Sequence, residues 1–194
     1  LVKRDVTEIV TPGTAVTDDL LETKRNNYLV SIYLDGNQCG LAMVDVSTGE
    51  FKISEMSKRE ISERIDSIAP AEIIISESHF SILQQHLSNF NDILVTRRDD
   101  WTFNYDFAQE TLTEHFGTLS LKGFGVDHLV KGISAAGAII AYLKENQKQK
   151  LIHINRLSLA DDSDYMIIDS TTRRNLELIQ SMNLMGKKGT LLSV

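Results

Sequence analysis

The stretch 27–54 alternates its side chains with a period of two, which predicts β-strands. The first segment of this stretch divides into two faces, with Tyr28, Val30, Ile32 and Leu34 on one and Leu29, Ser31 and Tyr33 on the other. Two glycine-bearing turn sequences follow, Asp35-Gly36 and Ser47-Thr48-Gly49, and they predict a three-stranded meander. Because both faces are apolar, we expect other elements to cover the sheet on both sides.

Helices and further strands are predicted to alternate after the meander. Ser57 is suited to cap a helix that runs to Ile68, because Glu60 stands three positions later as in a capping box. The short apolar runs at 72–76 and 92–96 predict buried strands, separated by a helix whose inner face carries Leu83, Leu87 and Phe90. Strands that alternate with helices favour parallel pairing. The expected fold class is therefore α/β, with a mixed central sheet flanked by helices.

Two more helices are predicted in the second half of the chain. The first carries Phe107, Leu112 and Phe116 and ends at Gly117. The second is long, follows Asp127 as a possible cap, and shows an apolar stripe at helical spacing: Leu129, Ile133, Ala136, Ile140 and Leu143. Ahead of both, we expect Trp101 and Phe103 to anchor a loop in the core.

The distribution of polar residues suggests the domain boundaries. The polar run 145–150 predicts the end of the sheet domain, so that residues 27–150 form one domain and residues 151–194 begin another. Residues 1–26 contain few apolar positions and indicate either a tether that feeds the meander or a plain N-terminal extension. The chain begins at Leu1 and ends among apolar residues, so we expect a piece of a larger protein.

Composition narrows the functional classes. The 194 residues carry a net charge of -7, which argues against a large nucleic-acid footprint because phosphate binding needs clustered Lys and Arg. The single cysteine, Cys39, lies in a predicted strand, which favours a buried, inert thiol in a reducing compartment. The longest apolar run is shorter than the roughly 20 residues that cross a bilayer, so no membrane association is expected.

The sequence contains no convincing active site. Its five histidines are scattered without metal-site spacing, and it has no phosphate-binding or dinucleotide motif. The predicted architecture is similar to the ribonuclease-H-like fold, whose nucleases need several carboxylates around two metals. Here Ser31 and Tyr33 occupy the middle of the first strand, Asp35 lies in a turn, and Asp45 has no evident acidic partner. We therefore expect no catalytic, cofactor-binding or metal-binding residues, and keep a metal-dependent nuclease as the alternative.

Several stretches, in this order and spacing, together resemble the MutS family of DNA mismatch-repair proteins. They are Ile9-Val10-Thr11-Pro12-Gly13-Thr14, Val44-Asp45-Val46-Ser47-Thr48-Gly49-Glu50-Phe51, His115-Phe116-Gly117, Gly123-Phe124-Gly125-Val126 and Ile168-Asp169-Ser170-Thr171-Thr172-Arg173-Arg174-Asn175-Leu176-Glu177-Leu178. The resemblance is to an internal portion of the proteins of this family. It implies a linker that leaves the mismatch-binding domain (1–26), a ribonuclease-H-like connector domain (27–150) and the start of a mainly helical core, or lever, domain (151–194).

The resemblance also implies roles for parts of the chain. The connector would couple the mismatch-reading and ATPase parts and offer a docking surface to MutL, with a hinge at Thr11, Pro12, Gly13 and Thr14. The junction between connector and core would involve Asp169, Arg173, Arg174 and Asn175. The chain itself would be no enzyme. The full-length family member would be a cytoplasmic, homodimeric, DNA-dependent ATPase that uses ATP and Mg and binds mismatched DNA through domains absent from this chain.

Overall fold

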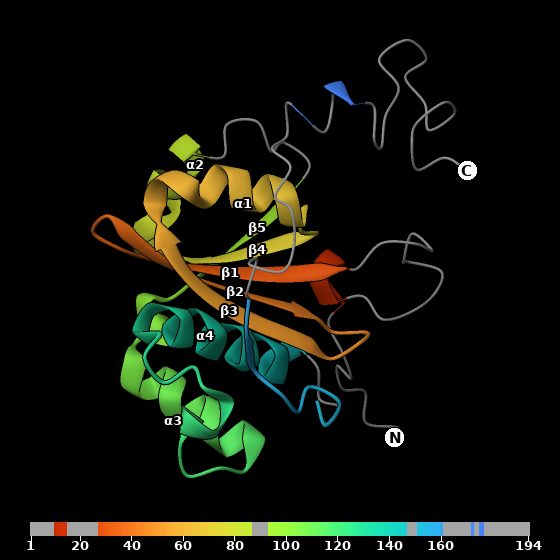
Figure 1. Cartoon of the computed structure of the whole chain (residues 1–194), viewed down its shortest axis with the longest axis vertical. Coiled ribbons are helices and arrows are strands. Elements are labelled where there is room, and N and C mark those ends of the chain that lie inside the picture. The colour runs from red at the N-terminus through yellow and green to blue at the C-terminus, as the bar shows by residue number, and fades with distance from the viewer. Residues whose placement is uncertain are drawn as a thin grey trace, which may run out of the picture.

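A six-stranded sheet in the order β5-β4-β1-β2-β3-β6 forms the centre of the molecule (Figure 1). The computed structural model describes residues 10–14, 27–86, 93–146, 151–160, 172, 175 and 176. The strands are β1 (Tyr28–Asp35), β2 (Gln38–Asp45), β3 (Glu50–Ser57), β4 (Glu72–Ser76), β5 (Leu94–Arg98) and β6 (Ser158–Leu159). The predicted α/β class, with a mixed sheet, is confirmed.

The first three strands form the predicted antiparallel meander. In the register of the sheet, Tyr28 lies opposite Asp45, and Val44 lies opposite Phe51. Positive φ angles of 58° at Gly36 and 77° at Gly49 close the two connecting turns, as expected of glycine.

Strands β4 and β5 extend the meander in parallel with β1, as the alternation of strands and helices predicts. The α-helices are α1 (Ile61–Ile68), α2 (Phe80–His86), α3 (Tyr105–Phe116) and α4 (Val130–Asn146). Short 3-10 turns precede or connect them: η1 (Pro12–Thr14), η2 (Lys58–Glu60), η3 (Glu77–His79), η4 (Asp100–Phe103) and η5 (Leu121–Phe124). Strand β5 begins later than the predicted 92–96, and the predicted helical residues Leu87 and Phe90 lie outside the described residues.

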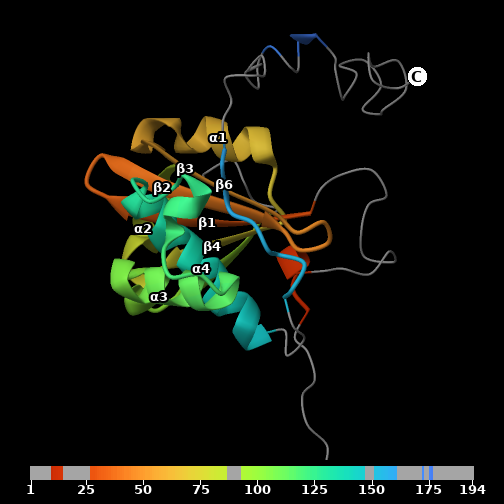
Figure 2. The same ribbon diagram turned by 60° about the horizontal axis from the view of Figure 1, so that its bottom comes forward.

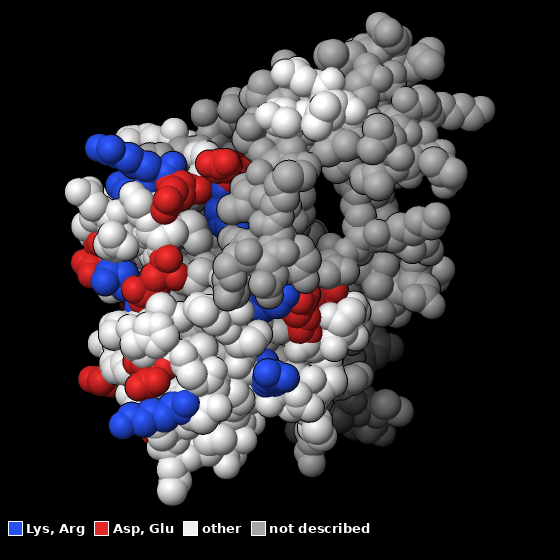
Figure 3. Space-filling model, viewed as in Figure 1, with Lys and Arg blue, Asp and Glu red and all other residues white. Residues whose placement is uncertain are grey.

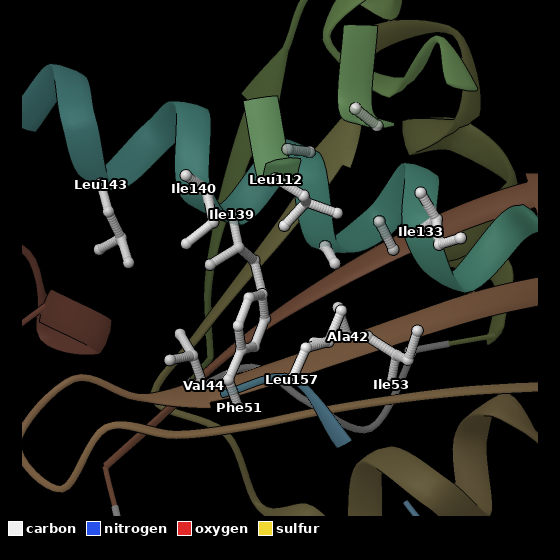
Figure 4. Packing of buried hydrophobic residues seen from close by; sticks show 14 of the residues in the cluster. Ala42, Val44, Phe51, Ile53, Leu112, Ile133, Ile139, Ile140, Leu143 and Leu157 are labelled. Atoms are coloured by element: carbon white, nitrogen blue, oxygen red, sulfur yellow. The ribbon is translucent and has the colours of Figure 1, made fainter. Parts of the chain in front are cut away.

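Helices cover both faces of the sheet, as its two apolar faces require. On one face, α1 and α2 bury the set Val30, Ile32, Leu34, Leu41, Met43, Ile61, Ile65, Ile73, Ile75 and Leu83. On the other face, α4 packs directly on the sheet and α3 packs on the outside of α4 (Figure 2). A close view of this second core shows side chains of α4, such as Ile139, above Val44 and Phe51 of the sheet (Figure 4).

The local signals at helix ends are confirmed. Ser57 and Glu60 form the predicted capping box, although the first turn that they stabilise is η2 rather than α1 itself. Gly117 ends α3 in the left-handed conformation with φ 62°.

The prediction for the aromatic loop before α3 is half right. Phe103 is buried, but the Trp101 side chain is 56% exposed and lies edge-on to Phe107 with 4.9 Å between ring centroids. Phe103 stacks on Tyr33 with 6.0 Å between ring centroids, so Phe103 anchors the loop while Trp101 stays on the surface.

Residues 151–160 pack on this sheet, beyond the predicted domain boundary at 150. Leu151, Ile154 and Leu157 are buried in the core that α4 covers, and Leu157 lies near Phe51 (Figure 4). Strand β6 then pairs in parallel with β3 at the edge of the sheet. The polar run that suggested the boundary begins inside α4, which ends at Asn146. The structure does not describe residues 161–171, where the predicted second domain would continue.

Candidate functional site

The carboxylates that would matter for a nuclease have structural partners. Asp45 is buried and accepts hydrogen bonds from the Ser47 backbone N–H at 2.9 Å and the Ser47 hydroxyl at 2.6 Å, so it closes the β2–β3 turn. Asp35 lies 3.6 Å from the ammonium of Lys131. Ser31, in the middle of β1, is a buried hydroxyl where such a nuclease needs an acid. Among the described residues, no three His, Cys, Asp or Glu side chains are grouped to hold a metal ion.

A different acidic residue, Glu72, is the centre of a polar cluster that joins four parts of the chain. Its side chain is fully buried at the start of β4. One carboxylate oxygen, Oε1, accepts hydrogen bonds from the hydroxyls of Thr96 and Tyr142, both at 2.7 Å. The other, Oε2, accepts from the Thr11 hydroxyl at 2.5 Å and from the Gly13 backbone N–H at 3.2 Å. The cluster therefore ties β5, α4 and residues 11–14 to β4.

The four donors occupy acceptor positions on both oxygens of the Glu72 carboxyl group, which compensates for its burial. Burial raises the pKa of the Tyr142 phenol above its ordinary value, and its hydrogen bond to Glu72 acts in the same direction. The phenol therefore remains a hydrogen-bond donor at neutral pH. The guanidinium of Arg98 lies over the Tyr142 ring, 5.8 Å from its centre. The hydrogen bonds to Glu72 come from segments that lie far apart along the chain, so the arrangement is suited to holding these segments together.

Residues 11–14, which we call the TPGT turn, contain the four predicted hinge residues. The turn is compact, because the Thr14 N–H donates to the Thr11 carbonyl at 3.0 Å and the Thr11 N–H donates to the Thr14 hydroxyl oxygen at 2.8 Å. A Cβ atom at Gly13 would lie 2.8 Å from the Cβ atom of Glu72, so glycine is required for this close approach. Any movement inside the turn would have to break these contacts, and the hinge role itself stays a prediction.

Sequence reasoning missed Glu72 and treated it only as the first residue of an apolar strand. A signal was available, because a single Glu directly before Ile73-Ile74-Ile75 in a buried strand needs compensating donors. The sequence gives no indication that those donors come from Thr11, Thr96 and Tyr142, which lie far apart along the chain.

The predicted junction residues are not brought into this cluster by the described structure. Asp169, Arg173 and Arg174 lie outside the described residues, and Asn175 is an exposed residue in a helical position. Their role at a junction between connector and core stays a prediction.

The surface of the described residues carries mixed charge and a few exposed apolar side chains. On the face seen in Figure 3, acidic and basic side chains are interspersed, which is unlike the continuous basic surface of a nucleic-acid interface. Leu119 is fully exposed, and Trp101 and Val130 are about half exposed. Of these three, only Trp101 is of a type that is enriched among the residues that dominate protein–protein binding, whereas singly exposed Leu and Val are ordinary on a protein surface. Of the helices that the structure describes, none combines the length and apolar character needed to cross a membrane.

Comparison with known sequences identifies the sheet domain. Residues 27–155 match the family described as MutS domain II. The chain belongs to the MutS family. It is 41% identical over 198 residues to the DNA mismatch repair protein MutS of Salinibacter ruber, and 41% identical over 194 residues to that of Dehalococcoides mccartyi strain CBDB1. Each alignment covers 100% of this chain but 22% of the relative, so the chain corresponds to about a fifth of these MutS proteins.

Proposed function

We propose that this chain is the connector part of a DNA mismatch-repair ATPase. It couples the part that reads mismatches to the part that hydrolyses ATP, and it offers a docking surface to MutL. The observation that carries the proposal is the match of residues 27–155 to MutS domain II, which is not the ATPase domain. A mixed sheet with buried cores on both faces is suited to such a role, because close-packed interiors transmit displacement with little deformation.

The remaining properties of the whole protein belong to this proposal as well. Mismatched DNA, ATP with Mg and a second copy of the protein would be bound by domains outside this chain, in the cytoplasm. Movement of the connector as one body would expose or hide its partner surface when nucleotide binds elsewhere. The nuclease alternative receives no support from the described carboxylates, because Asp45 and Asp35 are engaged in a turn and an ion pair.

MutL docking is tested by measuring the binding of purified MutL to the immobilised 194-residue chain by biolayer interferometry. Three variants change one exposed surface each: Glu63→Lys with Asp66→Lys on α1, Gln84→Lys on α2, and Trp101→Ser on η4. We expect one surface to carry the interaction, so that one variant weakens binding at least about tenfold while the others bind normally. Absence of binding to the unmodified chain, with MutL that does bind a full-length MutS, would overturn the docking proposal.

A further inference from the structure

The predicted hinge residues are bound to the domain that they are expected to move against. The TPGT turn, residues 11–14, is held from outside by the buried Glu72 carboxylate, which accepts hydrogen bonds from the Thr11 hydroxyl and the Gly13 N–H. Glu72 is itself held by Thr96 of β5 and Tyr142 of α4. The turn therefore makes its contacts with the centre of the sheet and with the helix that covers it.

A further hydrogen bond joins the TPGT turn to the residue directly before β1. The Asn27 side-chain amide, directly before β1, donates a hydrogen bond to the Pro12 carbonyl at 2.6 Å. Pro12 in the TPGT turn and Asn27 before β1 are thus bonded directly to each other. While this bond and those to Glu72 persist, the turn cannot move relative to the sheet.

We propose that Glu72 locks the TPGT turn onto the sheet, so that residues 11–14 move with the connector and do not act as its hinge. That the connector moves against another part of the protein rests on the proposed function, whereas the lock rests on the hydrogen bonds that Glu72 accepts from the turn. A segment fixed in this way passes displacement from an upstream domain directly to β4 and α4, whereas a flexible hinge at this position would absorb it.

Hydrogen exchange of backbone amides, measured by NMR on the 194-residue chain, tests the lock. We expect Glu72→Gln to speed exchange at Gly13 and Thr14 at least roughly tenfold, with β2 amides unchanged, because the amide side chain presents an NH₂ donor to hydroxyls that now donate to the carboxylate. Thr11→Val removes one donor from the turn without altering the sheet and should speed the same amides. Glu77→Gln is the matched control, because Glu77 is exposed directly after β4 and pairs with Arg97. This variant should leave amide exchange at Gly13 and Thr14 unchanged.

A distance measurement provides the second test. Nitroxide labels on cysteines placed at the exposed Val10 and at Gln84 on α2 report how firmly the turn is held. We expect the Cys39 thiol to take up no label, because it is buried. Electron–electron double resonance should give one narrow distance in the unmodified background and a broad distribution with Thr11→Val. Unchanged amide exchange in Thr11→Val, or a broad distance distribution before any lock residue is altered, would overturn the lock. Either result would leave the MutL-binding measurement unaffected, so the two proposals fail separately.

Discussion

Gly40 of β2 lies against the backbone of Lys131 at the start of α4, so closely that a Cβ atom on Gly40 would be 2.1 Å from the Lys131 carbonyl carbon. This contact brings the N-terminus of α4 down onto the sheet. The obstructing atoms belong to the backbone, so they cannot rotate away as a flexible side chain would.

Gly40→Ala is therefore expected to destabilise the domain by about 2 kcal/mol or more, as over-packing of a close-packed contact does. The measurement is the urea unfolding midpoint. Gly123→Ala is the matched control, because a Cβ atom there would meet nothing within 4 Å and Gly123 does not have a positive φ. Equal midpoints for the two variants would contradict the close approach of β2 and α4.

Glu55 of β3 caps α4 from outside the helix. Its carboxylate oxygen accepts hydrogen bonds from the backbone N–H groups of Lys131 at 2.5 Å and Gly132 at 3.1 Å, which have no partners within the helix. Glu55→Ala should lower the free energy of unfolding by about 1 kcal/mol, whereas Glu55→Gln should lose less because its amide oxygen still accepts. The comparison uses chemical denaturation, with Glu63→Ala on the exposed face of α1 as control. An effect of Glu55→Ala no larger than that of the control would count against the cap.

The Cys39 thiol should be chemically inert in the folded protein. It is fully buried, and burial, with the charge of Glu60 as the next contribution, raises its pKa to about 11. Because the thiolate is the reactive form, we expect negligible reaction with a thiol reagent at about pH 8 in the folded state. Complete reaction should follow in concentrated guanidinium chloride. Rapid modification under native conditions would show that the face of the sheet under α1 opens readily.

His115 should make stability depend on mild acidification. Its ring Nε2 lies 2.7 Å from the Ile154 carbonyl oxygen, and burial lowers its pKa below the ordinary 6.5. The nearby Lys144 and His153 add to this lowering, and the Ile154 hydrogen bond and Glu114 oppose it. Between the folded-state pKa and about 6.5 the unfolded chain binds more protons, so stability is complete above 6.5 and is lost as the pH falls.

The measurement compares urea midpoints at about pH 7.5 and about pH 5.5, above the range where most carboxylates titrate. We expect His115→Gln to reduce the loss of stability on acidification, because the amide can still donate to the carbonyl without titrating. The exposed His128 offers the matched control, His128→Gln, which should leave the loss unchanged. An equal loss in both variants would mean that other groups cause it.

The faces of the sheet and the ends of the helices follow from the sequence because they depend on neighbouring residues. Alternation along 28–34 decides which side chains face α1 and which face α4, since a strand turns successive side chains to opposite sides. Ser57 with Glu60 and the left-handed Gly117 set helix ends through bonds within a few residues. Membership of the MutS family can also be inferred from the sequence, because its short motifs occur in the family's order and spacing.

Other features depend on which distant segments the fold brings together. Glu72 opens an apolar strand, and its donors come from positions 11, 13, 96 and 142. Phe103 is buried beside Tyr33, whereas Trp101, two residues earlier, is exposed. The packing of residues 151–160 depends on His153 and His115 reaching carbonyls of Val46 and Ile154.

The sequence by itself determined the α/β class, the two apolar faces of the meander and the membership of the MutS family. Only the tertiary structure decided that the predicted hinge at residues 11–14 is fastened to the sheet through Glu72. The physical reason is the range of the interactions. Side-chain periodicity and capping arise from backbone geometry over a few residues, whereas the partners of a buried carboxylate are fixed by the three-dimensional path of the whole chain.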